Sequence, residues 1–382
     1  MEVKIHSSIR EIEKGPCDEL VGNHRLICTH RYLEAVERSH INDCRFFYPV
    51  VYEGGEIVAH TCVYFISTEL DAFARGMAKR IFNGIRKFRP DFLILHSVEC
   101  GTPVALGNTI SFRGDKDRPE RLRWLVRAVE QVACDMNVRI LLFRDFFENE
   151  RPFFDRLLEE GYRPLNNLPC ARLDIRWSSF AEYLDSMRSP YRHKITDRQK
   201  KCEAAGIRFE VLTDFASLAP DLARLWRNAY DHAVEYKREL LLPAFFENVS
   251  DGLRGRASVI LARRQGRPVG FALLLQDNAS LEWLFCGLDY ECNREDFIYF
   301  NLLYHIINSA IERGCKQLNL GITTIIPKLD VGAVAVPLHM YMKHTNPVMN
   351  RIVPFAFRSM TPSHTAERRS VFKNRDNGTV PR

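Results

Sequence analysis

Three side chains of this sequence are candidates for moving a proton. Glu282 lies within the apolar run of residues 281–288 (LEWLFCGL). A carboxylate inside such a strand costs free energy unless it is paired or functional, and a positioned carboxylate or imidazole can act as a general base. His344 is a second candidate base, and Tyr341 is a candidate general acid. In the structural alternative, Glu282 lies on a solvated strand face and His344 makes ordinary structural hydrogen bonds.

Two other residue patterns do not indicate a metal site. His96 and Glu99 have suitable spacing for two ligands, but no further ligand follows. Cys286 and Cys292 lack the spacing of zinc ligands, and no nearby histidine completes a set. A P-loop and a dinucleotide fingerprint are also absent from the sequence. We therefore expect no metal.

The candidate base is embedded in a regular succession of predicted elements. Two apolar runs, residues 257–261 and 269–275, flank a Gly-containing turn, which is the usual signal of an antiparallel hairpin. A third strand follows at 281–288. Residues 297–313 then place apolar side chains at helical spacing, and residues 316–320 return as a strand. The predicted order is strand, strand, strand, helix, strand.

The first half of the chain shows the same order. A hairpin is predicted for residues 46–52 and 57–66, followed by a strand at 92–98, a helix that begins near Pro119, and a strand at 139–143. The two halves are not visibly similar in sequence, so the repeat is one of architecture.

This pattern predicts an α/β (α+β) protein with two tandem domains. We expect the first domain at residues 1–176 and the second, which carries the site, at residues 177–360. Residues 361–382 are polar and charged with few apolar anchors, so we expect a disordered tail.

Composition limits the class of protein. With 382 residues, of which 46% are hydrophobic, the chain can form about two domains of roughly 150 residues, each with a core. The formal charge of +6 is modest and does not by itself indicate nucleic-acid binding. No stretch approaches the ~18 uninterrupted apolar residues of a spanning helix, and the N-terminus lacks the apolar segment of a signal peptide. We expect a cytoplasmic protein with reduced cysteines, soluble or peripheral at the inner face of the membrane.

The basic segment of residues 73–89 carries six Lys/Arg and no acid. Its apolar side chains fall near one side of a helical wheel, which is typical of a helix that lies in an anionic membrane interface. The alternative is a solvated surface helix, and two glycines in the segment weaken the helical prediction.

Several motifs resemble the GNAT superfamily, and within it the tandem-domain, Fem-like group that includes the BioF2-like acyltransferases. The resemblance covers residues 178–350 well. Its motifs are Tyr191-Arg192-x-Lys194, Cys286-Gly287-Leu288-Asp289, Leu320-Gly321-Ile322-Thr323-Thr324-x-x-x-Lys328, Gly332-Ala333 and Pro337-Leu338-x-x-Tyr341-x-x-His344. It implies two tandem GNAT-like domains, each a mixed, mostly antiparallel sheet flanked by helices. Members of the group transfer acyl groups from acyl-CoA, or aminoacyl groups from charged tRNA, to amines, and bacterial ceramide synthases belong to the broader set.

The sequence departs from the superfamily at the loop that usually binds the pyrophosphate of CoA. Residues 289–296 (DYECNRED) are acidic and contain no glycine. The resemblance therefore implies that acyl-CoA, the expected cosubstrate, is held by other side chains, and we expect Arg294, Thr323, Thr324 and Lys328 in this role. The long loop of residues 100–117 is an alternative place for the donor.

The resemblance also implies a cleft where the sheet of the second half opens beside Trp283 and Phe285, in which a thioester meets a neutral amine. In this cleft Glu282 or His344 would act as the base, and Tyr341 would protonate the departing thiolate. We rank acyl-CoA-dependent N-acylation of a hydrophobic or lipid-like amine first, with a sphingoid base as one example. A Fem-type enzyme that uses aminoacyl-tRNA is second, and a binding module that has lost activity is third. Nucleic acid is expected as a partner only in the second case.

Overall fold

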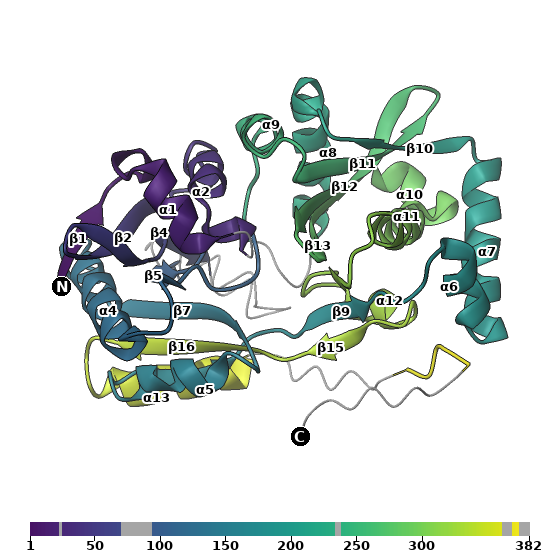
Figure 1. The fold of residues 1–382 in the computed structure, drawn as a ribbon. Helices are drawn as coiled ribbons and strands as arrows, with labels where there is room; N and C mark the ends of the chain where they lie inside the picture. The colour runs from purple at the N-terminus through teal and green to yellow at the C-terminus, as the bar shows by residue number, and fades with distance from the viewer. Residues whose placement is uncertain (23–24, 70–93, 234–237, 361–368, 374–382) are drawn as a thin grey trace, which may run out of the picture.

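The structure is a computed structural model that describes residues 1–22, 25–69, 94–233, 238–360 and 369–373, without the side chains of residues 69, 293–294 and 356–360 (Figure 1). The basic segment of residues 73–89 lies outside these ranges. Among the described residues, no helix has the length and apolar character needed to cross a membrane.

The second half is built on a seven-stranded mixed sheet. Its strands, in spatial order, are β10 (Ile207–Leu212), β11 (Ala257–Arg264), β12 (Arg267–Asp277), β13 (Ser280–Leu288), β14 (Gln317–Asn319), β9 (Cys170–Asp174) and β15 (Val334–Val336). β13 and β14 are parallel, and helix α11 (Ile298–Glu312) connects them, while the other neighbours are antiparallel. The predicted order of strand, strand, strand, helix, strand is thus present.

Helices cover both faces of this sheet because its strands alternate between two apolar faces. Val259, Leu261 and Phe271 pack in one cluster with the helices α8 and α9, whereas Ile260 and Ala272 pack in another with α11. The helices of this half are α6 (Phe180–Ser186), α7 (Ser189–Ala204), α8 (Ala219–His232), α9 (Pro243–Gly252), α10 (Tyr290–Asp296), α11 and α12 (Ile325–Leu329), with a 3₁₀ turn η5 (Ala216–Leu218).

The first half is built on a nine-stranded mixed sheet. Its strands, in spatial order, are β6 (Ser111–Phe112), β3 (Glu56–His60), β2 (Arg45–Glu53), β4 (Val63–Glu69), β5 (Ile94–Cys100), β7 (Ile140–Phe147), β16 (Leu338–His344) and β8 (Arg163–Asn166), with β1 (Glu2–His6) paired to β2. Its helices are α1 (Lys14–Val21), α2 (His30–Glu37), α4 (Arg118–Asp135), α5 (Arg151–Phe154) and α13 (Met349–Met360), with the 3₁₀ turns η1 (Ile9–Glu11), η2 (Leu26–Cys28) and η4 (Asp155–Leu158). The parallel pair β5–β7, joined through α4, corresponds to the pair β13–β14. These two mixed sheets confirm the predicted fold class.

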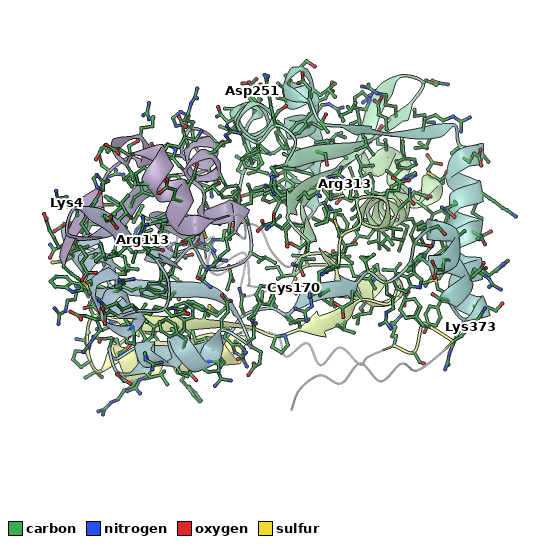
Figure 2. The ribbon with its side chains drawn as sticks, viewed as in Figure 1. Lys4, Arg113, Cys170, Asp251, Arg313 and Lys373 are labelled. Atoms are coloured by element: carbon green, nitrogen blue, oxygen red, sulfur yellow. The ribbon has the colours of Figure 1, made fainter. Side chains whose placement is uncertain are left out.

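The two sheets exchange strands, so they do not follow the expected division after residue 176. β9 precedes that boundary but lies in the second sheet, and β16 belongs to the expected second domain but lies in the first sheet. The crossing is an antiparallel ribbon, because β8 pairs with β16 and β9 pairs with β15 on either side of it. The backbone N–H of Asn167 donates to the carbonyl of Leu338 between these pairings (2.9 Å). Cys170, at the start of β9, lies where the chain passes from one sheet to the other (Figure 2).

The two halves also share a core. One apolar cluster contains residues of α2 and β2 from the first half and of α9 and β12 from the second. The helices α2 and α9 approach so closely that a Cβ at Gly252 would lie 3.2 Å from that of Ala35. The arrangement is therefore one of two sheets joined by packed helices and a crossing ribbon, rather than two domains on a linker.

The expected disordered tail is wrong for residues 369–373. Val371 is buried, and its carbonyl accepts from the backbone N–H of Arg188 (2.9 Å). Phe372 forms a bridge with Met187. Both contacts are made to the junction between helices α6 and α7 of the second half. Two apolar residues within a polar sequence, Val371 and Phe372, are therefore sufficient to hold residues 369–373 in place.

Candidate functional site between the two halves

The gap predicted beside Trp283 is present. β13 and β14 pair from Ser280 and Gln317 only as far as Glu282 and Asn319, where β14 ends. β13 continues to Leu288. The two parallel strands therefore part at Trp283, which leaves an opening in the middle of the sheet.

A β-bulge lies at the same place. Leu273 pairs with Phe285, but Leu274 pairs with Trp283, so Leu284 has no partner on β12. The extra residue of a bulge is left out of the hydrogen-bonded ladder. The backbone N–H of Leu284 is consequently a candidate donor to an oxyanion formed in the opening.

Glu282 is held at the point where the strands part. Asn319 Nδ2 donates to Glu282 Oε1 (2.6 Å), and Ser280 Oγ lies 3.3 Å from the same oxygen. Burial raises the pKa of Glu282 to about 7; the hydrogen bonds from Asn319 and Ser280 oppose this rise, and the charge of Asp277 adds to it. A carboxyl with this pKa is about half ionised at neutral pH, as a general base requires.

Glu282 faces a cavity of about 280 Å³ that lies between the two halves. Leu284, two residues along the strand, lines the same cavity. The other lining residues are apolar or acidic for the most part: Arg25, Leu26, Ile27, Ala105, Leu106, Gly107, Phe147, Asn149, Glu150, Leu275 and Asp277. Glu150 is already paired, since it accepts from Asn108 Nδ2 (2.7 Å) and from the backbone N–H of Phe147 (2.9 Å).

Lys328 lies on the opposite face of β13 from Glu282. Its Nζ is 5.1 Å from the ring centre of Trp283 and donates to the carbonyl of Thr323 (2.5 Å). The side chain is buried, and burial lowers the pKa of Lys328 to about 8. Gly321, at φ +79°, makes room for it, because a Cβ there would lie 3.7 Å from Nζ and 3.6 Å from the Trp283 carbonyl oxygen. The opening thus has a carboxyl on one face and an ammonium on the other.

The remaining residues expected to hold the donor are placed as follows. Thr323 and Thr324 lie in the turn that leads into α12, next to Lys328. Thr324 has φ +51°, and Thr323 contributes its carbonyl to Lys328. Arg294 lies in α10, and its side chain is outside the described residues.

Two of the four acidic residues around α10 are paired with arginines. Asp289 lies 3.6 Å from Arg267, and Asp296 lies 3.1 Å from Arg264. The segment that replaces the usual phosphate-binding loop is therefore less negative than its sequence indicates.

Tyr341 and His344 do not join Glu282, so the predicted three-residue arrangement is wrong. Both lie on β16, which the strand exchange places in the first sheet. Tyr341 is buried and its hydroxyl donates to Asp155 (2.7 Å), while His344 Nδ1 accepts from the backbone N–H of Asn346 (3.0 Å). Burial raises the pKa of Tyr341. These bonds give both side chains a structural role.

Sequence reasoning missed three residues around Glu282. Asn319 is its hydrogen-bond partner across the parallel pair, Ser280 lies two residues before it, and Asp277 affects its pKa. An asparagine at the end of a short apolar strand and an Asp-Asn turn were the available signals. Their proximity to Glu282, however, depends on strand pairing.

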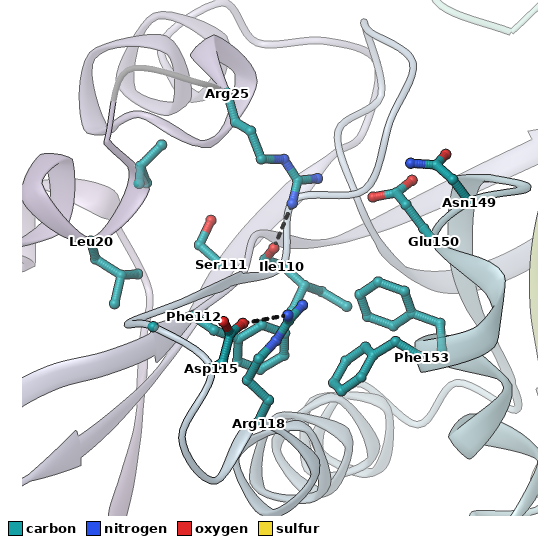
Figure 3. A pocket seen from close by; sticks show the side chains of 13 residues that line it. Leu20, Arg25, Ile110, Ser111, Phe112, Asp115, Arg118, Asn149, Glu150 and Phe153 are labelled. Atoms are coloured by element: carbon teal, nitrogen blue, oxygen red, sulfur yellow. Dashed lines mark hydrogen bonds and ion pairs between the residues drawn. The ribbon is translucent and has the colours of Figure 1, made fainter.

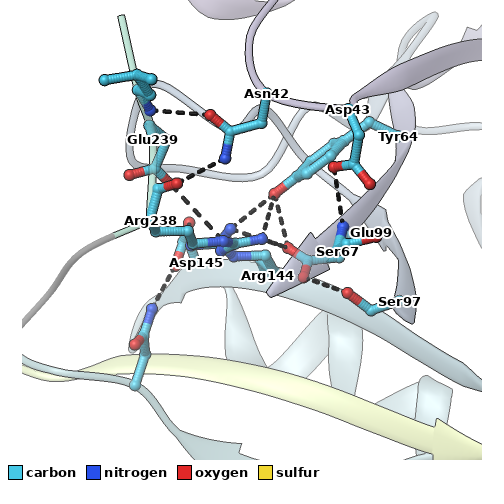
Figure 4. Close-up of polar contacts among 12 residues, drawn as sticks. Asn42, Asp43, Tyr64, Ser67, Ser97, Glu99, Arg144, Asp145, Arg238 and Glu239 are labelled. Atoms are coloured by element: carbon cyan, nitrogen blue, oxygen red, sulfur yellow. Dashed lines mark hydrogen bonds and ion pairs between the residues drawn. The ribbon is translucent and has the colours of Figure 1, made fainter. Parts of the chain in front are cut away.

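The corresponding parallel pair of the first half carries an ion-pair network near the end of β5 (Figure 4). Glu99 of β5 accepts from Arg144 of β7 (2.9 Å) and from Arg238 of the second half (2.7 Å), and the Tyr64 hydroxyl donates to it (2.6 Å). Burial opposes ionisation, but Arg238 and Arg144 hold the pKa of Glu99 well below its usual range. The carboxylate of the first half is therefore held by charged side chains, whereas Glu282 of the second half faces a cavity.

A second cavity, of about 440 Å³, lies in the first half beside the N-terminus of α4 (Figure 3). Residues 110–112 and 114–115 line it, together with Arg118. It shares Arg25, Asn149 and Glu150 with the cavity at Glu282. Among the described residues, no group of three or more His, Cys, Asp and Glu side chains forms a metal-ligand set in either cavity or elsewhere.

Known proteins resemble both the second half and the whole chain. The family described as "Acetyltransferase (GNAT) domain" matches residues 189–324. A Mycobacterium tuberculosis protein named "Putative 8-amino-7-oxononanoate synthase 2" is 31% identical over 327 residues. That alignment covers 83% of this chain but 42% of the relative, so the chain spans less than half of the relative's length.

Two solved structures share the fold of the whole chain. The structure of FemX has a TM-score of 0.55 at 12% identity and covers 93% of this chain and all of its own. A tandem GNAT protein from the clavulanic acid biosynthesis pathway has a TM-score of 0.52 at 11% identity, covering 91% and 99% of the two chains. At such identities the likeness concerns the fold. With the domain match and the parted strands, it shows a GNAT domain in the second half and, over the whole chain, the tandem fold that these GNAT and Fem-like structures share.

Proposed function

We propose that the protein is an N-acyltransferase that moves an acyl group from acyl-CoA to a primary amine. The observation that carries this proposal is the position of Glu282: its carboxyl lies where β13 and β14 part, faces a largely apolar cavity and has a pKa of about 7.

The raised pKa of Glu282 matters because the acceptor must lose a proton before it attacks. An aliphatic ammonium has a pKa near 10.4, so proton transfer to an ordinary glutamate at about 4.3 costs about 8 kcal/mol. Transfer to a carboxyl with a pKa of about 7 costs roughly 5 kcal/mol. The raised pKa of Glu282 therefore removes roughly two fifths of the cost of this proton transfer.

The reaction would proceed as follows. Glu282 takes a proton from the ammonium, and the neutral nitrogen attacks the thioester carbonyl to form the C–N bond. The backbone N–H of Leu284 donates to the resulting oxyanion. When the C–S bond breaks, the protonated Glu282 gives its proton to the departing thiolate. The nitrogen then loses its second proton to the regenerated Glu282 carboxylate and from there to solvent, so the products are a neutral amide and a free thiol.

In this proposal the acyl donor and the amine acceptor bind on opposite faces of the opening. Lys328 supplies a cation on one face and suits the donor, together with Thr323 and Thr324. The cavity at Glu282 suits the acceptor, because Asp277 and Glu150 match an ammonium and the leucines match an apolar chain. A hydrophobic or lipid-like amine, such as a sphingoid base, is the acceptor class we propose. The cavity beside α4 is an alternative position for the donor.

The direct test follows free thiol while purified protein is incubated with a panel of acyl-CoAs and long-chain amines. We expect thiol release that requires both substrates and falls at least about 100-fold in Glu282→Gln, the usual loss when a general base is removed. Release that needs no amine, or that is equal in the variant, would contradict the proposal.

The second candidate is an aminoacyl-tRNA-dependent transferase, which the fold likeness to FemX favours. Transfer of an aminoacyl group from charged tRNA would disappear on ribonuclease treatment, whereas transfer from acyl-CoA would not. Ribonuclease-sensitive transfer without acyl-CoA turnover would establish the second candidate in place of the first.

A further inference from the structure

The outward side of helix α13 is apolar and exposed. Val348, which directly precedes the helix, and Ile352 and Phe355 are spaced by four and three residues, so they share one side. Their exposed fractions are 66%, 52% and 75%, and Met349 beside them is 39% exposed. The opposite side packs on the first sheet: Val353 contacts the cluster of Leu142, Leu165 and Met342, and Pro354 is buried.

Single exposed apolar side chains are common on protein surfaces and need no explanation. Here, however, four of the ten large apolar side chains that are exposed among the described residues lie within residues 348–355. Clustering of this kind marks an interaction surface. We call the side chains of Val348, Met349, Ile352 and Phe355 the α13 face.

Exposed cations lie on α13 and on the strand beneath it. Arg351 of α13 is exposed, and so is Arg163 on β8, the strand against which α13 packs. The sequence from residue 331 to residue 360 contains no Asp or Glu. A helix with an apolar side, flanking cations and no acid is the form that lies in the interface of an anionic bilayer.

A second copy of this chain fits the α13 face less well. In a two-fold symmetric contact the same patch meets itself, so the exposed arginines of the two copies would approach each other without acidic partners from the helix. We propose that the α13 face rests on a lipid surface with anionic headgroups. This inference is independent of the proposed reaction and concerns described residues rather than the basic segment of residues 73–89.

The experiment is flotation of the full-length protein with vesicles of phosphatidylcholine alone and with vesicles of two parts phosphatidylcholine to one part phosphatidylglycerol. We expect the native protein to float with the anionic vesicles and more weakly with the neutral ones. The double variant Ile352→Asp/Phe355→Asp should bind the anionic vesicles at least about tenfold more weakly, because two apolar side chains no longer enter the interface. Arg351→Glu should reduce flotation with anionic vesicles and leave that with neutral vesicles unchanged.

The matched control is Val211→Asp, which places the same charge at a 49% exposed apolar residue of β10 in the other sheet. This control should float like the native protein, and all variants should keep the native urea midpoint. Three results would overturn the proposal: native flotation of the double variant, an equal loss in Val211→Asp, or a change of oligomeric state in the double variant with flotation unaltered. The last result would identify the α13 face as a contact between copies.

Discussion

At the scale of single residues, the chemistry depends on how Glu282 is held. Its pKa of about 7 reflects burial and the charge of Asp277, opposed by hydrogen bonds from Asn319 and Ser280. Glu282 was predictable because an acid within an apolar run is a local anomaly. Asn319 was not, because its amide reaches Glu282 only through the parallel pairing of β13 with β14.

The charge of Asp277 should be visible in the pH dependence of catalysis. Because Asp277 raises the pKa of Glu282, the variant Asp277→Asn should lower it. A base acts in its deprotonated form, so the acidic limb of kcat/KM should move to lower pH, and the measurement is a pH profile of thiol release. Asp251→Asn, an exposed residue of α9 paired with Arg254, is the control and should leave the limb in place. If the acidic limb of kcat/KM stays in place or moves to higher pH in Asp277→Asn, then Asp277 does not raise the pKa of a catalytic Glu282.

At the scale of elements, the second half follows its sequence closely. β11, β12, β13 and α11 match the predicted runs because each depends on local periodicity and turn residues. The strand exchange of β9 and β16 could not be predicted in this way, since their pairing joins residues more than 150 positions apart. That exchange is also why Tyr341 and His344 were placed wrongly.

The close packing of β13 on α8 gives a test at this scale. A Cβ at Gly287 would lie 2.6 Å from the carbonyl carbon of Leu225 and 2.7 Å from the backbone nitrogen of Trp226, so backbone would have to move. Gly287→Ala should therefore lower the free energy of unfolding by about 3 kcal/mol or more. Gly15→Ala, in α1 with nothing within 4 Å of the new methyl, should be neutral or stabilising. Urea unfolding measures both, and equal stabilities would show that β13 and α8 are not packed in this way.

At the scale of the whole molecule, the site exists because the two halves are fixed to each other. The cavity at Glu282 has walls from both, and the crossing ribbon, the shared core and the network at Glu99 hold them together. The sequence indicated two similar halves. It did not indicate that the buried Glu99 of the first half would pair with Arg238 of the second.

Removing the Glu99 carboxylate should destabilise the molecule in a pH-dependent way. Glu99→Gln removes the carboxylate that Arg144 and Arg238 share and leaves them the longer contacts to Asp145 (3.5 Å) and Glu239 (3.7 Å), so we expect it to cost about 3–5 kcal/mol near neutral pH. Because the folded pKa of Glu99 is depressed, its contribution is present above the unfolded value of about 4.3 and is lost as the pH falls through the folded one. The difference in unfolding free energy between native protein and variant should therefore shrink below about pH 4.

Glu203→Gln provides the comparison for this measurement. Glu203 forms an exposed pair with Arg208, and such pairs contribute about 0–1 kcal/mol. A Glu99→Gln variant as stable as Glu203→Gln at neutral pH would mean that the network does not join the two halves.

The most direct test of the central claim is the pH dependence of amine-dependent thiol release in the native protein and in Glu282→Gln. We predict that kcat/KM of the native protein rises through an apparent pKa of about 7, and that the variant loses both this inflection and at least about 100-fold in rate. Full turnover in Glu282→Gln with the native pH profile would contradict the assignment of Glu282 as the base at the opening between β13 and β14.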